Sequence, residues 1–125
     1  MAKLPKISES EWLVMQVLWS KGPLTANEVV EQLASRNRWN PRTIKTLINR
    51  LLKKGALKFQ KEGRQYRYIA AVSESKCVRK ETRSFVRRVY GGAVRPMLAA
   101  FLEDAKLSDD EIKELKKVLD QKGRE

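Results

Sequence analysis

The sequence predicts a mainly α-helical chain with one small β-hairpin. Apolar residues recur at helical spacing in six stretches, three of which open with a Ser/Thr-x-x-Glu capping box. Between the third and fourth stretches, two short segments with β-like composition flank a Glu-Gly pair. Three helices and the hairpin therefore make up a first domain, 1–72, and helices alone make up a second domain, 73–125.

Capping boxes mark the starts of the first two helices. Ser8-x-x-Glu11 begins the first helix, and Lys21-Gly22-Pro23 ends it, because proline and glycine interrupt helices. Thr25-x-x-Glu28 begins a shorter second helix. The polar stretch 35–40 then connects this helix to the third.

Residues 40–57 predict an amphipathic helix with a basic outer face. Asn40 can cap it, Pro41 suits its first turn, and Gly55 lies where a left-handed residue would end it. The apolar side consists of Ile44, Leu47, Ile48, Leu51 and Leu52. The polar side consists of Arg42, Thr43, Lys45, Thr46, Asn49, Arg50 and Lys53. These polar residue types can read base edges or bind phosphates in a major groove. A solvated surface helix would show the same pattern.

Two β-like segments, 57–61 and 64–69, follow this helix, with Glu62-Gly63 as the expected turn. In the second segment, Tyr66 and Tyr68 alternate with polar residues. One face of the hairpin should therefore pack its tyrosines on the apolar residues of the first segment, while the other face meets solvent or phosphate. Three helices followed by a basic hairpin are in the order of a winged helix-turn-helix.

The second domain consists of three amphipathic helices with a Gly91-Gly92 break between the first and the second. About 50 residues in three helices are near the lower limit for an independent hydrophobic core. We therefore expect these apolar faces to meet a second copy of the chain. A two-fold dimer would also space two recognition helices for successive major grooves. The expected interface residues are Phe85, Val89, Met97, Leu98, Phe101, Leu102, Leu115 and Leu119.

The charge of the chain favours a polyanionic partner. The net charge is +12, and 14 Lys and Arg stand against 5 Asp and Glu in residues 1–72. Such an excess favours nucleic acid or an anionic membrane surface. No uninterrupted apolar run is longer than the six residues 97–102, and no secretory signal is recognisable. We therefore expect a cytoplasmic protein without a membrane partner.

The usage of histidine and cysteine argues against an enzyme and against a metal cofactor. The chain has no histidine, which excludes His-based catalytic triads and His-ligated metals. Cys77 is the only cysteine, so no thiolate cluster and no intrachain disulfide can form. Asp109, Asp110 and Glu111 follow Ser108 in the spacing of a capping box. We interpret them as a helix start rather than as an acid/base or metal site.

Nearly the whole chain resembles the penicillinase-repressor family of bacterial transcription factors, which includes BlaI, MecI and CopY. The resemblance lies in ISESEWLVMQVLW, TANEVVEQL, WNPRTIKTLINRLLKKGAL, KEGRQYRY, FVRRVYGGAVRPMLAAFLED and LSDDEIKELKKVL. It implies an N-terminal winged helix and a C-terminal dimerisation region that repress resistance genes from palindromic operators. It further implies that bases are read by Arg42, Thr43, Lys45 and Thr46. Contacts to the DNA backbone are expected from Asn49, Arg50, Lys61, Arg64 and Arg67.

Two departures from the family bear on how repression ends. Copper-responsive members carry a C-terminal cysteine cluster that this chain lacks, so direct copper sensing is not expected. In the β-lactamase regulators, a membrane sensor leads to cleavage between an Asn and a Phe in the dimerisation region. The aligned pair here is Ala100-Phe101, and a sensor-linked protease is the partner that this route would require.

The sequence thus predicts a homodimeric repressor, without enzymatic activity, on a palindromic double-stranded DNA operator of a β-lactam-resistance or related stress operon. Two alternatives stay open. One is a small-molecule-responsive winged-helix regulator with a ligand pocket between its halves. The other is a winged-helix protein-interaction module that uses its positive charge on an acidic partner.

Overall fold

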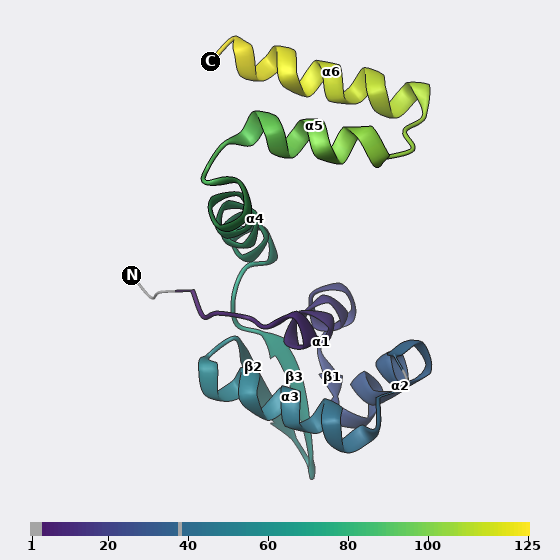
Figure 1. The fold of residues 1–125 in the computed structure, drawn as a ribbon. Helices are drawn as coiled ribbons and strands as arrows, with labels where there is room; N and C mark the ends of the chain where they lie inside the picture. The colour runs from purple at the N-terminus through teal and green to yellow at the C-terminus, as the bar shows by residue number, and fades with distance from the viewer. Residues whose placement is uncertain (1–3, 38) are drawn as a thin grey trace. The chain divides into compact units, whose positions relative to one another are not determined.

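The computed structural model describes residues 4–37 and 39–125 (Figure 1). The helices are α1 (Glu9–Lys21), α2 (Ala26–Asn37), α3 (Pro41–Lys54), α4 (Glu74–Tyr90), α5 (Val94–Asp104) and α6 (Asp109–Gly123). The strands are β1 (Leu24–Thr25), β2 (Leu57–Glu62) and β3 (Gln65–Ala70). The predicted fold class, mainly helical with a small hairpin, is confirmed.

The chain forms two compact units, Met1–Lys80 and Glu81–Glu125. The units part within α4, because Cys77 in its first turns is buried in the core of the N-terminal unit. The division into domains after residue 72 stays a prediction, and it differs from these units by the start of α4.

Local capping explains where the N-terminal helices begin. Ser8 and Glu11 bond reciprocally, with the Glu11 amide donating to Ser8 Oγ at 3.2 Å and the Ser8 amide donating to Glu11 Oε1 at 2.9 Å. Thr25 and Glu28 form the same pair of bonds at the start of α2. Each box satisfies amide donors that a helix start leaves without partners. The predicted polar connector 35–40 is shorter than expected, since α2 continues to Asn37.

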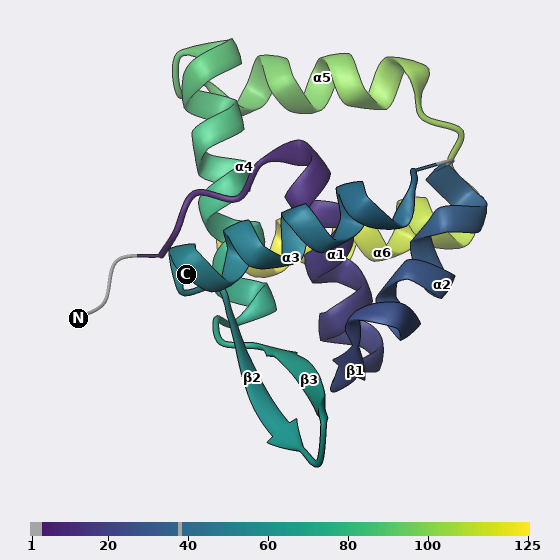
Figure 2. The same cartoon turned by 90° about the horizontal axis from the view of Figure 1, so that it is seen from below.

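The N-terminal unit also contains a three-stranded antiparallel sheet in the order β1-β3-β2, with β1 between α1 and α2 and the hairpin of β2 and β3 after α3 (Figure 2). Strand β1 was not predicted, because two residues are too few to show an alternating pattern. The turn also differs from the prediction by one residue. Glu62 pairs with Gln65, so the two-residue loop is Gly63-Arg64, and Gly63 adopts the positive φ of 63° that this tight loop requires. Arg64 therefore lies in the turn rather than in a strand.

The core of the N-terminal unit lies between the three helices and the base of the hairpin. Its most buried side chains include Val14, Met15, Val29, Ile44, Ile48 and Leu51. At its edge, the rings of Trp12 and Trp19 meet edge to face with centroids 5.6 Å apart. The Trp19 indole donates to the Val72 carbonyl at 3.0 Å, which fixes the chain where it leaves the sheet. The apolar side of α3 thus packs against the core of this unit.

Glu11 is a charged residue inside this unit, with only 1% of its surface exposed. Its carboxylate accepts a hydrogen bond from Lys54 at the end of α3, and the same ammonium donates to the Lys6 carbonyl at 3.0 Å. Burial raises the pKa of Glu11, but the bonds from Lys54 and Ser8 outweigh burial and lower the pKa below its ordinary value of 4.5. The pair ties the last turn of α3 to the first turn of α1.

We expect Lys54→Met to lower the free energy of unfolding by about 3 kcal/mol at pH 7, because it leaves the Glu11 carboxylate buried without its cation. The pKa of Glu11 is lower in the folded than in the unfolded chain, so its contribution is present above pH 4.5 and is lost as the pH falls through the folded value. Urea titrations at several pH values measure both effects. Lys53→Met, at the neighbouring exposed position, is the control, and an equal loss in both variants would contradict the role of the pair.

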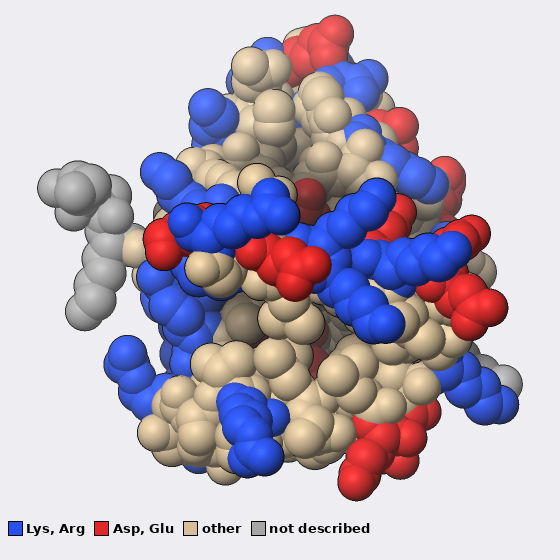
Figure 3. Space-filling model, turned by 90° about the horizontal axis from the view of Figure 1, so that it is seen from above, with Lys and Arg blue, Asp and Glu red and all other residues tan. Residues whose placement is uncertain are grey.

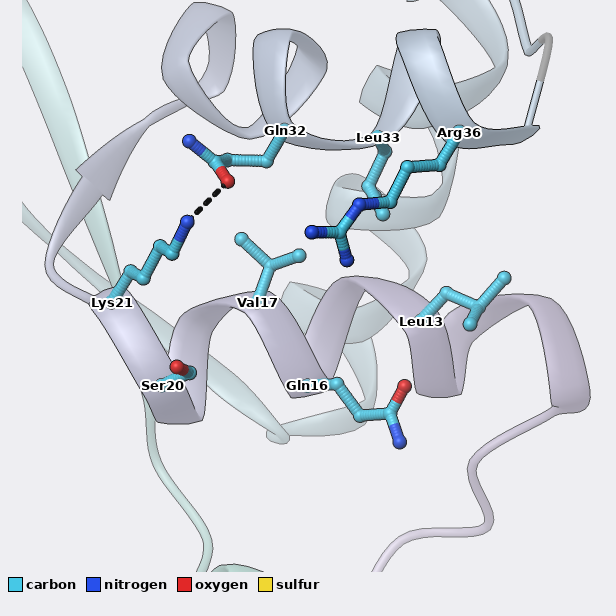
Figure 4. A pocket seen from close by; sticks show the side chains of 8 residues that line it. All are labelled: Leu13, Gln16, Val17, Ser20, Lys21, Gln32, Leu33 and Arg36. Atoms are coloured by element: carbon cyan, nitrogen blue, oxygen red, sulfur yellow. Dashed lines mark hydrogen bonds between the residues drawn. The ribbon is translucent and has the colours of Figure 1, made fainter.

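Helices α1 and α2 are also joined across a groove of about 360 Å³ (Figure 4). Lys21 at the end of α1 donates to Gln32 Oε1 on α2 at 2.6 Å, while the Arg36 side chain extends from α2 toward α1 near Val17. The contact thus connects the last turn of α1 with the middle of α2.

The C-terminal unit comprises the end of α4, α5 and α6. Gly91 and Gly92 both have positive φ and separate α4 from α5, as predicted. Ser108 and Glu111 form the predicted capping box of α6. Among residues 81–125, all of which the structure describes, Val86 is the only buried apolar side chain. This unit therefore has almost no core within one chain.

Candidate nucleic-acid interface

Helix α3 presents the predicted polar face to solvent. Its apolar side is buried at Ile44, Leu47, Ile48 and Leu51, and Leu52 is half-buried. All seven residues of the opposite side are exposed, namely Arg42, Thr43, Lys45, Thr46, Asn49, Arg50 and Lys53. Asn40 caps the helix by accepting the Thr43 amide at 2.9 Å, and Gly55 ends it with a φ of 81°. The helix thus exposes four cations, two threonines and one asparagine on a face whose opposite side is packed in the core.

The two threonines on this face already have hydrogen-bond acceptors. Thr43 Oγ1 donates to Asn40 Oδ1 at 3.2 Å, and Thr46 Oγ1 donates to the Arg42 carbonyl at 2.9 Å. With their hydroxyl protons engaged, the threonines offer DNA acceptor oxygens and methyl groups, and the methyl groups suit the thymine methyl. The long side chains of Arg42 and Lys45 are the donors of this first turn that reach furthest from the helix.

The hairpin places the predicted wing residues on different sides. Pairing of Lys61 with Tyr66 puts Lys61 on the face that also carries Phe59, and Arg64 lies in the turn. Arg67 alternates with these residues and lies on the opposite face, paired with Gln60. The three cations, all expected to meet the DNA backbone, therefore do not form one row.

Phe59, Tyr66 and Tyr68 form an aromatic cluster on the Lys61 side of the hairpin. The Phe59 and Tyr66 rings meet edge to face at 4.9 Å, and Tyr68 lies 6.5 Å from Phe59. This confirms that both tyrosines pack on Phe59. The cluster lies beyond the helical core at its outer end, which leaves Phe59 52% and Tyr66 44% exposed.

Arg67 forms ion pairs with two carboxylates, and the sequence predicted neither pair. Its Nε donates to Glu62 Oε2 at 2.6 Å, and its Nη1 lies 3.6 Å from Glu28 Oε1. Glu62 was assigned only to a turn and Glu28 only to a helix cap. The strand pairing that brings them together involves β1, which left no pattern in the sequence.

Positive charge is concentrated in the N-terminal unit. This unit has 17 Lys and Arg against 6 Asp and Glu, while the C-terminal unit has 10 against 9. Figure 3 shows acidic side chains interspersed with basic ones on the surface that it draws. The excess that attracts a polyanion thus belongs to the unit that carries α3 and the wing.

Within residues 4–37 and 39–125, no group of three or more His, Cys, Asp or Glu side chains is arranged to hold a metal ion. None of the helices described has the length and hydropathy of a membrane span. Cys77 is 4% exposed, and burial raises the pKa of its thiol, which disfavours the reactive thiolate. Cys77 is therefore a core residue.

Most of the predicted interface residues of the C-terminal unit are exposed in the single chain. Phe85, Val89, Leu98, Phe101, Leu102, Leu115 and Leu119 are between 37% and 62% exposed, and Met97 is half-buried. Leu102, Leu115 and Leu119 line one apolar groove of about 400 Å³ between α5 and α6. Ala100 and Phe101 lie within α5, and both are exposed.

Comparisons with known proteins agree with this geometry. A family model described as penicillinase repressor matches residues 7–121. The penicillinase repressor of Bacillus licheniformis is 40% identical over 121 residues, which make up 97% of this chain and 94% of that protein. The methicillin resistance regulatory protein MecI of Staphylococcus aureus (strain N315) is 38% identical over 120 residues, 96% of this chain and 98% of that protein.

A solved structure is similar to the N-terminal part. It is the solution structure of the monomeric form of Bacillus licheniformis BlaI in complex with the blaP half-operator. Its sequence is 44% identical, and it covers 60% of this chain and 92% of its own with a TM-score of 0.53. The family match and the two full-length relatives lead to one conclusion. The chain belongs to the penicillinase repressor family of winged-helix DNA-binding repressors.

Proposed function

We propose that this chain represses a β-lactam-resistance or related stress operon by binding a palindromic operator as a homodimer. The observation that carries the proposal is the exposed basic face of α3, held on a buried apolar side in a unit that is 44% identical to a BlaI domain solved on a half-operator. Such a repressor acts in the cytoplasm, where its operator lies.

In this proposal, α3 enters the major groove. Its first turn, with Arg42, Thr43, Lys45 and Thr46, reads base edges, and Asn49 and Arg50 contact the backbone farther along the helix. Lys61 and Arg64 reach phosphates from the hairpin. Phosphate contacts supply affinity for any sequence, whereas base contacts supply the preference for the operator.

In this proposal, the C-terminal unit forms the contact with the second copy of the chain. Its helices expose large apolar side chains in all three segments, including Phe85, Leu98 and Leu119, and such surfaces mark contact sites in soluble proteins. A two-fold axis through this unit would present two α3 helices to the two halves of a palindrome. The mixed charge of the unit suits a protein contact better than a second DNA contact.

Relief of repression follows from the same region. We propose that a sensor-linked protease cuts between Ala100 and Phe101, which are exposed but lie inside the α5 helix. A helical bond must open locally before a protease can bind it. The sensor thus needs to act at one turn of α5, and the cut would separate the end of α5 and all of α6 from the DNA-binding unit.

Arg42→Ala is expected to cost about 1–3 kcal/mol on operator DNA and to relax the preference at particular base pairs. Lys61→Ala is expected to weaken all sequences about equally and to lower the slope of log K against log salt by roughly one unit. Titrations on operator and random DNA at several salt concentrations measure both changes. Equal losses of Arg42→Ala on the two DNAs would contradict base reading.

Selection of genomic DNA by the purified protein tests the proposed function itself. We expect enrichment of a two-fold symmetric site whose neighbouring genes identify the operon. Weak binding without sequence preference would overturn the proposal and favour a module that uses its charge on an acidic protein. Release of the selected site by a small molecule, with the chain left intact, would favour a ligand-responsive regulator over proteolytic relief.

A further inference from the structure

Arg67 joins two parts of the N-terminal unit that are far apart in sequence. Its guanidinium lies 2.6 Å from a carboxylate oxygen of Glu62, the last residue of β2 before the wing turn. The same guanidinium lies 3.6 Å from Glu28 in the first turn of α2. One side chain thus connects the outer end of the wing with the start of the helix that leads into α3.

Thr25 fixes the Glu28 side of this pair of contacts. Arg67 is paired with Thr25 across the β1–β3 ladder, and the Thr25 amide donates to Glu28 Oε1 at 3.0 Å. The bonds from Thr25, followed by the charge of Arg67, keep the pKa of Glu28 below its ordinary value. Glu28 is therefore ionised at neutral pH and fixed by the helix cap that it completes.

We infer that Arg67 is a positioning residue, and that the Glu62–Arg67–Glu28 clasp fixes the direction of the wing relative to α3. This inference rests on the proposed function, and it replaces the expected phosphate contact of Arg67. In the structure, Nε and Nη1 of the guanidinium face carboxylates, which leaves fewer of its donors for a phosphate. In the clasp, it instead holds the turn that carries Arg64, and a wing fixed in advance loses less conformational freedom when DNA binds.

The sign of the effect of Glu62→Gln distinguishes the clasp from simple electrostatics. Removal of a negative charge near DNA should tighten binding if Glu62 is only a surface charge. If the clasp positions the wing, Glu62→Gln weakens operator binding by about threefold to fivefold, in the range of an exposed ion pair. Glu31→Gln is the matched control, because Glu31 is an exposed carboxylate of the same unit with no ion pair in the described part of the chain.

A double-mutant cycle, measured on the operator selected from genomic DNA, tests whether Glu62 and Arg67 act together. Arg67→Gln should weaken binding by about as much as Glu62→Gln, and the double variant should be no weaker than Arg67→Gln alone, because either change opens the clasp. Additive losses, or tighter binding by Glu62→Gln, would overturn the inference.

Amide hydrogen exchange in the DNA-free protein tests the clasp without reference to the operator. We expect the amides of β2 and β3 near the turn to exchange about threefold to fivefold faster in Glu62→Gln and Arg67→Gln, and to be unchanged in Glu31→Gln. Unchanged exchange in all three variants would overturn the clasp even if operator binding is confirmed. Failure of the wild-type protein to select an operator would instead overturn the proposed function and leave this measurement valid.

Discussion

Leu98→Asp should convert the protein into a folded monomer that binds its operator about a hundredfold or more weakly. Leu98 is 37% exposed in the single chain, so a carboxylate at this position can remain hydrated in the monomer. In the proposed dimer, the same carboxylate would be buried without a partner among apolar side chains, at a cost of several kcal/mol. Loss of the dimer removes the second recognition helix, whose tethering strengthens binding by about 10²–10⁴.

Sedimentation at micromolar concentration and operator titration measure the two losses together. Ala99→Asp is the matched control, since it adds the same charge at the next position of α5, outside the predicted interface set. A chain that stays dimeric as Leu98→Asp, or a wild-type protein that is monomeric with full operator affinity, would contradict the proposed assembly.

Truncation after Ala100 should have an effect of similar size. The cut removes Phe101, Leu102, Leu115 and Leu119, four of the eight predicted interface residues, while the unit Met1–Lys80 keeps its core. We expect fragment 1–100 to fold in its N-terminal unit, to be monomeric, and to bind a single half-site about a hundredfold more weakly than full-length protein binds the operator.

Circular dichroism, sedimentation and DNA titration of the fragment test this outcome. A fragment that binds the operator as tightly as the full chain would contradict relief of repression by cleavage. Immunoblots of cells treated with a β-lactam test whether the cut occurs naturally. Induced target genes together with an uncut repressor would overturn the cleavage step while leaving the result for the fragment in place.

Patterns that are local in sequence predicted much of the fold. The Ser-x-x-Glu and Thr-x-x-Glu boxes, the cap at Asn40 and the left-handed Gly55 each depend on residues within one turn of a helix. The exposed face of α3 followed from helical periodicity alone, and the structure places all seven of its residues in solvent. Interactions of this kind are set by neighbours along the chain, so one sequence is enough to infer them.

The features that the sequence did not predict depend on distant residues. Glu11 and Lys54 are 43 positions apart, and the sequence indicated only a helix cap for Glu11 and no role for Lys54. Arg67 was expected to contact phosphate, because the sequence did not indicate that carboxylates from β2 and α2 lie beside it. The two-residue strand β1 exists through its pairing with β3, and no local preference in two residues could have indicated it.

If the chain represses as the proposed dimer, the scarcity of buried apolar residues in its C-terminal unit makes repression depend on the amount of protein in the cell. Val86 is the only buried apolar side chain of residues 81–125, so in the proposed dimer this unit gains its core only when two chains meet. While monomers predominate, the number of dimers, and with it operator occupancy, grows with the square of the copy number. A modest fall in copy number, through slower synthesis or growth dilution, then causes a larger fall in repression. In the proposed dimer, the small core of this unit thus makes repression respond more steeply than linearly to copy number.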